Sequence, residues 1–186
     1  MKVSLLFCSL ILLSCSAPEK KTSAVNPAQD NGQIEEEISR LFLGLSQAFN
    51  GAAINTDSLF DAYYERDVRY VTPWGSTEPL DSTKARLRNA IHHVRDFTYR
   101  MEGMQVKSYT DAAYASFVLR QNYQVDGNPL EEYLPTTMVL ERRGSGWKIV
   151  HVHRSTDYET IKQYVAIQQK RESKIYRPGG ATDGSF

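Results

Sequence analysis

The sequence is poor in cysteine and carries no excess of charge of either sign. Both cysteines, Cys8 and Cys15, fall within the first fifteen of 186 residues. The rest of the chain therefore forms neither a disulfide nor a cysteine-based metal site, and its stability must come from a packed core. Lys+Arg and Asp+Glu both number 22, and no basic run stands out. This balance argues against a nucleic-acid partner, which normally leaves a positive electrostatic footprint.

The longest apolar run lies at the N-terminus. Residues 3–13 follow Lys2 and have the length of a signal-peptide core, which is too short to span a bilayer as a helix. The run closes on "LLSC", Leu12 to Cys15, which resembles a bacterial lipobox. We therefore expect a lipoprotein signal peptide over 1–14 and a lipid-anchored Cys15 on the periplasmic or cell-surface side of the cell envelope. The alternatives are an ordinary secretory signal and an N-terminal apolar tail.

The remaining segments predict a tether, one domain and a helical extension. Residues 15–33 are polar and predict a flexible tether. Apolar residues at helical spacing then predict three helices: Ile34 to about Phe49, a short one from Asp57, and about Asp81 to Val94. A period of two predicts strands over 68–72, 99–106, 112–125, 132–142 and 147–154, with "DGNP" (126–129) as a hairpin turn. The domain covers 34–157, the extension 158–175 (helical to about Glu172), and a disordered tail 176–186.

This order of elements predicts an α+β fold. Helices followed by an antiparallel meander are typical of a curved sheet that wraps around helices. Such a cone leaves a mouth in which a small molecule can bind.

The last predicted hairpin carries a family resemblance. "RR", "GW" and "IVHVHRS", between Arg142 and Ser155, resemble the cone-shaped superfamily of nuclear transport factor 2, and locally the association domain of calcium/calmodulin-dependent protein kinase II and related SnoaL-like domains. The resemblance implies a cystatin-like cone whose members are enzymes, binding modules or oligomerisation hubs. It also places the hub's pocket arginine at Arg154. Three other polar pocket positions of the hub fall at Thr83, Ile91 and Met138, so we do not expect the same small carboxylate as ligand.

Two histidines on the last predicted strand raise the question of a metal site. Strict alternation places His151 and His153 on the face of Trp147 and Ile149, about 7 Å apart at Cα. A pair at this spacing can bind zinc, but Glu132 and Asp157, the available third ligands, follow no motif spacing. We expect no metal and no cofactor. The alternative is that the histidines hydrogen-bond within the sheet or lie at a subunit interface.

Arg154 falls on the opposite face, which the resemblance turns towards the interior or mouth of the cone. A partly buried arginine needs an anion, either a protein carboxylate or an anionic group of a ligand. Four aromatic residues are our candidates to bind a flat, partly apolar ligand beside it, although each also suits plain core packing. They are Tyr64, Tyr70, Trp74 and Tyr123.

Three functions remain open from the sequence. The leading hypothesis is a lipid-anchored domain that binds a small molecule and forms a homodimer. The second is a cofactor-independent isomerase, dehydratase or cyclase in which His93 or an acidic residue abstracts a proton next to a carbonyl. The third is a purely structural dimerisation module.

Overall fold

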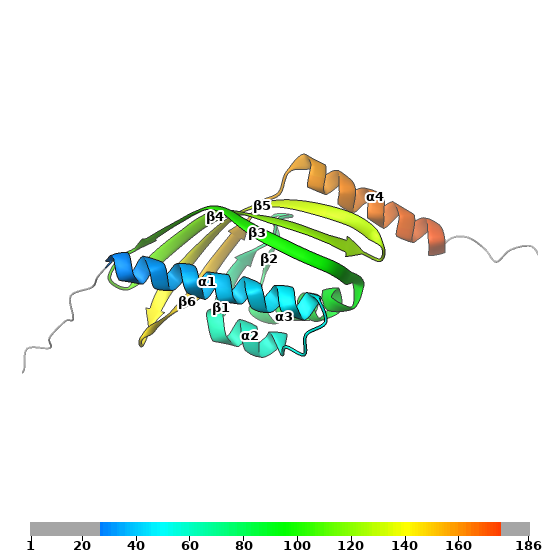
Figure 1. Ribbon diagram of the computed structural model, residues 1–186. Coiled ribbons are helices and arrows are strands. Elements are labelled where there is room, and N and C mark those ends of the chain that lie inside the picture. Colours follow the sequence, from blue (N-terminus) through cyan, green and yellow to red (C-terminus); the bar gives the residue numbers. More distant parts are fainter. Residues whose placement is uncertain (1–26, 176–186) are drawn as a thin grey trace, which may run out of the picture.

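The computed structural model describes residues 27–175, which form the helices and strands labelled in Figure 1. In chain order these are α1 (Pro27–Phe49), α2 (Thr56–Tyr63), β1 (Tyr64–Val71), β2 (Thr77–Glu78), α3 (Leu80–His93), β3 (Val94–Ser108), β4 (Ala112–Val125), β5 (Asn128–Arg143), β6 (Gly146–Arg154) and α4 (Tyr158–Ile175). The predicted signal peptide, the acylated Cys15 and the predicted tail over 176–186 lie outside the described residues. Among the described helices, none combines the length and the apolar character that crossing a membrane requires.

A single curved sheet carries the fold. Its strand order is β2-β1-β6-β5-β4-β3, with β1 and β6 parallel and the other neighbours antiparallel. Asp126 and Gly127 both have positive φ, as a two-residue type I′ hairpin turn requires. α1 lies along one side of the sheet with α2 and α3 near it, whereas α4 (orange) runs along the far part of β5 (Figure 1). The predicted α+β fold, a curved sheet around helices, is confirmed.

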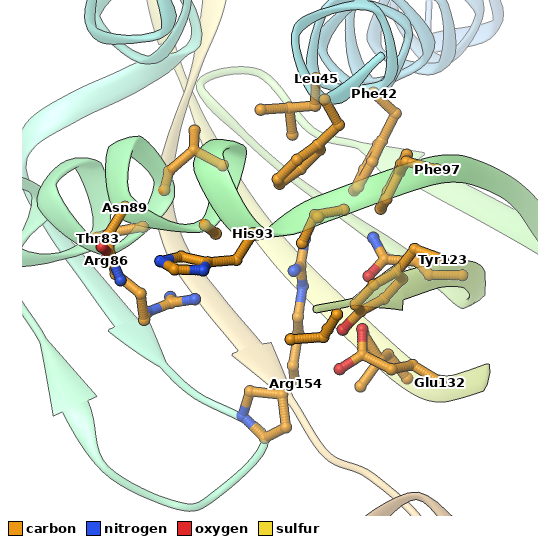
Figure 2. Close-up of a pocket in the computed structure, with 18 of the residues that line it drawn as sticks. Phe42, Leu45, Thr83, Arg86, Asn89, His93, Phe97, Tyr123, Glu132 and Arg154 are labelled. Carbon is orange, nitrogen blue, oxygen red and sulfur yellow. The ribbon is translucent and has the colours of Figure 1, made fainter. Parts of the chain in front are cut away.

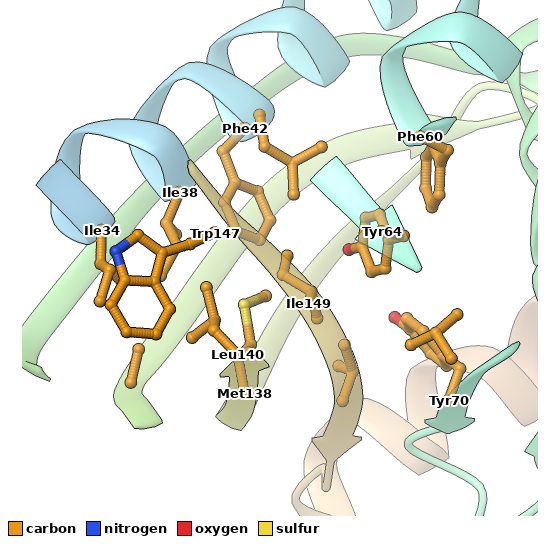
Figure 3. Packing of buried hydrophobic residues seen from close by; sticks show 14 of the residues in the cluster. Ile34, Ile38, Phe42, Phe60, Tyr64, Tyr70, Met138, Leu140, Trp147 and Ile149 are labelled. Atoms are coloured by element: carbon orange, nitrogen blue, oxygen red, sulfur yellow. The ribbon is translucent and has the colours of Figure 1, made fainter. Parts of the chain in front are cut away.

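The core forms between α1 and the sheet. Ile34, Ile38 and Phe42 recur on one side of α1 and are almost fully buried. Figure 3 shows them beside Met138, Leu140 and Ile149 of the sheet. Each such side chain contributes about 1.5–3 kcal/mol to folding when it leaves water. Side chains of α1 and of the sheet therefore fill this part of the cone.

The helix α1 begins earlier than predicted. Residues 27–33 belong to the predicted flexible tether, but they form the first two turns of α1. Asn31 and Gly32 are weak helix formers, so the local sequence hides this start. Asp30, which is buried, forms an ion pair of 2.6 Å with Arg142, and the Asn31 side chain accepts a hydrogen bond from the backbone N–H of Ser108. The first two turns of α1 are therefore stabilised by contacts with the sheet and not by the helix propensity of their residues.

Three strands also begin well before the predicted residue. β1 starts at Tyr64 instead of Val68, β3 starts at Val94 directly after α3, and β5 starts at Asn128 instead of Glu132, so the turn is shorter than predicted. Polar residues such as Arg66 and Asp67 in β1, and Arg95 and Asp96 in β3, interrupt the apolar alternation at these ends. The sheet pairing is irregular at the same places, between Tyr64 and Arg69 and between Arg95 and Thr98.

A β-bulge in β6 reverses the predicted orientation of the two histidines. Leu140 pairs with Ile149 while the adjacent Val139 pairs with His151, so Val150 is an extra residue in β6. Beyond the bulge Val152, fully buried, follows Trp147 and Ile149 on the inner face. The prediction that His151 and His153 share the face of Trp147 and Ile149 is therefore wrong, and both lie on the outer face.

Candidate functional site

A cavity of about 390 Å³ lies in the open half of the cone. Its walls come from α1, α2, α3, α4 and all strands of the sheet except β2. All six residues that the sequence offers as catalytic or ligand-binding candidates line it, and Figure 2 shows three of them by name, His93, Tyr123 and Arg154. The other three are Tyr64, Tyr70 and Trp74. The structure thus brings these candidates into one space, while a ligand role for each remains a prediction.

Arg154 reaches into this cavity from the end of β6. Its guanidinium carbon lies 5.6 Å from the centre of the Phe42 ring and 5.5 Å from that of Tyr70. Its Nε atom is buried and has no hydrogen-bond acceptor among residues 27–175. Nor does Arg154 form an ion pair within that part of the chain. The bulge at Val150 is what gives it this inward direction, because Arg154 shares the face of Val152.

A tyrosine pair forms the wall beside Arg154. Tyr64 and Tyr70 are both 4% exposed and lie on β1, and the Tyr64 ring stacks on Phe60 at 4.8 Å. Figure 3 shows their two hydroxyl groups on the same side of the core. Burial raises the pKa of Tyr64 far above its usual value, the neighbouring Tyr70 adds to the rise, and Arg154 opposes it. The Tyr64 hydroxyl is therefore neutral at physiological pH.

Glu132 is a buried carboxyl group in the opposite wall. It is 6% exposed and accepts a hydrogen bond from the hydroxyl of Tyr164, which lies 2.8 Å from the hydroxyl of Tyr123. Burial raises the pKa of Glu132. The hydrogen bonds of Tyr164 and Tyr123 and the charges of Arg154 and Arg86 lower this pKa, but by less than burial raises it. Burial likewise raises the pKa values of Tyr123 and Tyr164, and the adjacent Glu132 contributes to both. We call Glu132, Tyr123 and Tyr164 the carboxyl–tyrosine cluster.

Trp74 lies at the edge of the cavity. Its side chain is about half exposed, and its ring meets Tyr164 edge-on at 4.7 Å. A more open groove, lined by Trp74, Tyr164, Val165, Gln168 and Gln169, continues from this pair over α4. Trp74 and Tyr164 therefore separate the cavity from the outer surface.

His93 is the histidine that faces the cavity. It ends α3, and its Nδ1 lies 2.9 Å from a carboxylate oxygen of Asp126 in the β4–β5 turn. The backbone N–H of Asp126 donates to the carbonyl of His93, which fixes the two residues side by side. A carboxylate that accepts from Nδ1 leaves Nε2 of a neutral imidazole as the proton acceptor, which is the arrangement of a general base.

Among the described residues, the two outer histidines, His151 and His153, have no third metal ligand beside them. Within residues 27–175, no three His, Cys, Asp or Glu side chains lie close enough together to hold a metal ion. Burial lowers the pKa of His151, and the nearby Arg69 and His153 lower it further. His151 is therefore neutral at pH 7 and is part of the outer surface of the sheet.

Two polar residues of the cavity, Glu132 and Tyr164, are not among the ligand-binding candidates that the sequence offers. Sequence reasoning considers Glu132 only as a metal ligand, yet this residue lies two positions from each of Leu130 and Leu134, both buried. Alternation thus marks Glu132 as a carboxylate on an apolar face, which is a usable signal. Tyr164 falls on the apolar side of the last predicted helix, but no pattern shows that this helix closes the cavity.

Comparisons with known proteins agree with the geometry. A family described as the SnoaL-like domain matches residues 44–159. The CaMKII hub of S. rosetta is 18% identical, with 71% of this chain and all of that chain (100%) covered and a TM-score of 0.57. A suggested dehydratase of the NTF2-like family from Streptomyces avermitilis is 13% identical, with 72% and 99% covered and a TM-score of 0.59. An NTF2-like protein from Cytophaga hutchinsonii is 10% identical, with 67% and 95% covered and a TM-score of 0.56. At these identities the solved structures share the fold, and no curated protein matches.

Proposed function

Because this chain belongs to the SnoaL-like domain family, whose cone can hold a small molecule, we propose that it is a ligand-binding domain for a partly apolar molecule with an anionic group. The observation that carries the proposal is Arg154, whose Nε is buried without an acceptor among the described residues. A buried cation without an anion is costly, and a carboxylate is the anion whose shape best matches a guanidinium. The aromatic walls supply the apolar contacts that such a ligand needs.

The proposal is tested by titration calorimetry with a series of aryl carboxylates of increasing length: phenylacetate, 3-phenylpropionate and 4-phenylbutyrate. We expect the wild type to bind at least one of them, and Arg154→Gln to weaken that binding tenfold or more, equivalent to about 1.4 kcal/mol. Arg154→Lys, which keeps the charge without the fork of donors, is expected to fall between the two. Arg100→Gln is the matched control, because Arg100 lies on β3, outside the cavity lining, and pairs with Glu102.

Stability measurements separate a binding defect from a folding defect. Removal of a buried unpaired charge does not weaken the unliganded domain, so Arg154→Gln is expected to melt no lower than the wild type. A folded wild type that binds none of the three acids, or an Arg154→Gln variant that binds them as well as the wild type, would overturn the proposal.

A second candidate function is enzymatic. The His93–Asp126 pair at the cavity wall favours it, because it resembles a general base held by a carboxylate. Arg154 or a tyrosine of the cavity would then stabilise the enolate formed when His93 removes a proton next to a carbonyl. Exchange of the α-protons of phenylpyruvate in deuterated water, followed by NMR, tests this. Exchange that persists unchanged in His93→Gln contradicts it.

We further propose that the domain self-associates as a homodimer and is held at the cell envelope through a lipid on Cys15. Similarity to a CaMKII hub supports the first part, and the lipobox "LLSC" supports the second. Metabolic labelling with a fatty acid tests the anchor: label should enter the wild type, and Cys15→Ser should abolish it.

A further inference from the structure

The cavity holds a buried carboxyl group, Glu132, and a half-buried arginine, Arg154, that form no ion pair with each other. Arg154 and Glu132 both line it, yet no ion pair joins them, and neither has another ion-pair partner within residues 27–175. The other charged groups of the lining are already matched, since Arg86 bonds to Glu78 at 3.3 Å and His93 to Asp126 at 2.9 Å. One positive and one negative group thus remain for a ligand. Figure 2 shows the Glu132 and Arg154 side chains on adjacent parts of the wall.

The carboxyl–tyrosine cluster is not needed to attach α4. The helix is already held on β5 by Thr160, whose side chain is bonded to the backbone of β5, and Ile167 of the helix is buried. A carboxyl group at this position adds a desolvation cost that an apolar side chain would avoid. An ionised carboxylate also has about four acceptor positions, of which the Tyr164 hydroxyl fills one. The rest are available to a donor inside the cavity.

We infer that the ligand is a zwitterion, an amino carboxylate with an apolar body, which places its carboxylate at Arg154 and its ammonium group at Glu132. This rests on the proposed function and adds the second charged group of the ligand. An ammonium group has three N–H donors for the unused acceptor positions of Glu132. The rings of Tyr123 and Tyr164, whose hydroxyls join Glu132 in the carboxyl–tyrosine cluster, line the same cavity, and an aromatic face can stabilise a cation.

Tyr164 joins this subsite from a part of the chain that the family model does not cover. It comes from α4, and it lies beyond residues 44–159, the part that the family covers. Its hydroxyl bonds to Glu132 and to Tyr123, so it orients the carboxyl group without carrying charge itself. Tyr164 is therefore a positioning residue for the recognition of the ammonium group.

The test uses ligands that differ by one charged group. L-Phenylalanine and 3-amino-3-phenylpropanoate carry both groups at two spacings, 3-phenylpropionate lacks the ammonium group, and 2-phenylethylamine lacks the carboxylate. With the full wild-type chain we expect one of the two amino acids to bind at least tenfold tighter than either single-charge analogue. Glu132→Gln should remove this preference and leave the affinity for 3-phenylpropionate within about twofold, whereas Tyr164→Phe should reduce the preference. Glu131→Gln, at the exposed neighbour on the same strand, should change neither.

Proton exchange on binding gives an independent readout. The groups that face Glu132 are Tyr164 of α4, Tyr123 of β4, Arg154 of β6 and Arg86 of α3. A ligand ammonium group favours the charged carboxylate, so the amino acid should release a proton on binding. 3-Phenylpropionate brings a negative charge instead and should take a proton up. Titration calorimetry in two buffers of different ionisation enthalpy measures both signs.

The outcomes separate this inference from the proposed function. Binding of 3-phenylpropionate with an affinity equal to or above that of both amino acids overturns the zwitterion assignment and leaves the anion site standing. A preference for an amino acid that survives Glu132→Gln also overturns it. Failure of every carboxylate to bind a folded wild type overturns both.

Discussion

At the scale of single residues, the carboxyl group of Glu132 couples the stability of the unliganded domain to pH. Burial raises its pKa in the folded state above the ordinary value of 4.5. The folded state thus binds this proton more tightly than the unfolded chain does. The resulting stabilisation is complete below pH 4.5 and is lost as the pH rises through the raised pKa. Its size is about 1.4 kcal/mol for each pH unit that separates the folded-state pKa from the unfolded-state pKa.

Glu132→Gln removes this dependence, because an amide does not titrate. We expect the free energy of unfolding of Glu132→Gln, relative to the wild type, to increase as the pH rises above 4.5. Urea denaturation at a series of pH values measures the difference, with Glu131→Gln as the control that should give a flat line. A difference that stays constant or falls with pH for Glu132→Gln would show that burial does not raise the pKa of its carboxyl group.

Arg154 points inward, as predicted. The prediction nevertheless assumes strict alternation of side chains along β6, which the structure does not show. Strict alternation places Arg154 opposite Trp147 and Ile149, whereas the structure places all three on the inner face. The bulge at Val150 accounts for the difference. Nothing in "WKIVHVHR" marks a bulge, because no glycine or other special residue occurs there. Only the pairing with β5 determines the register.

At the scale of secondary structure, the hairpin strands are the most predictable elements. β4 has the predicted bounds, since its buried and exposed residues alternate and a turn with two positive φ values follows it. The start of α1 is not predictable, because Arg142, the partner of Asp30, is 112 positions away in sequence. Long-range contacts decide that boundary.

The ion pair between Asp30 and Arg142 is therefore expected to stabilise the first turns of α1. Its side chains are 12% and 23% exposed, and the Arg142 guanidinium also lies 4.3 Å from the Trp147 ring centre. Asp30→Asn should lower the free energy of unfolding by about 1–3 kcal/mol, because it leaves a partly buried arginine without its anion. Guanidinium chloride denaturation measures this loss, and faster amide hydrogen exchange in residues 27–33 should accompany it.

Glu36→Gln is the matched control on the same helix. The Glu36–Arg40 pair is about 60% exposed on both sides. Such a pair contributes less than about 0.5 kcal/mol. Equal effects of the two substitutions would mean that the early start of α1 does not depend on the contact with the sheet.

At the scale of the whole molecule, the α+β cone follows from element order, but the closed cavity does not. Each hairpin and helix is encoded locally, so their sequence leads to a known architecture. The position of α4 depends on the bonds of Thr160 to the backbone of β5 and on the contact of Tyr164 with Trp74, which join distant parts of the chain. The sequence therefore predicts the helix α4, but it does not predict that this helix forms part of the cavity wall.

The outer face of the sheet is where we expect two copies to meet. Tyr114, Val139 and His151 pair laterally across β4, β5 and β6 and form one row on the face away from the core. Tyr114 remains 39% exposed, which is unusual for a large aromatic side chain on an otherwise complete sheet. Because His151 is neutral at pH 7, the row carries little charge and suits contact with a second copy of itself.

Val139→Glu places a charge at the centre of this row and should shift the protein from dimer to monomer. In a two-fold contact the two introduced carboxylates lie near each other and lose their water, so we expect the dissociation constant to rise at least a hundredfold, equivalent to about 2.7 kcal/mol. Native mass spectrometry and light scattering measure the masses. Gln105→Glu, on the exposed edge strand β3, adds the same charge outside the row and should leave the dimer intact. A wild type that is monomeric at every concentration tested, or a Val139→Glu variant that stays dimeric, would remove this face as the interface, whereas the ligand site inside the cone does not depend on it.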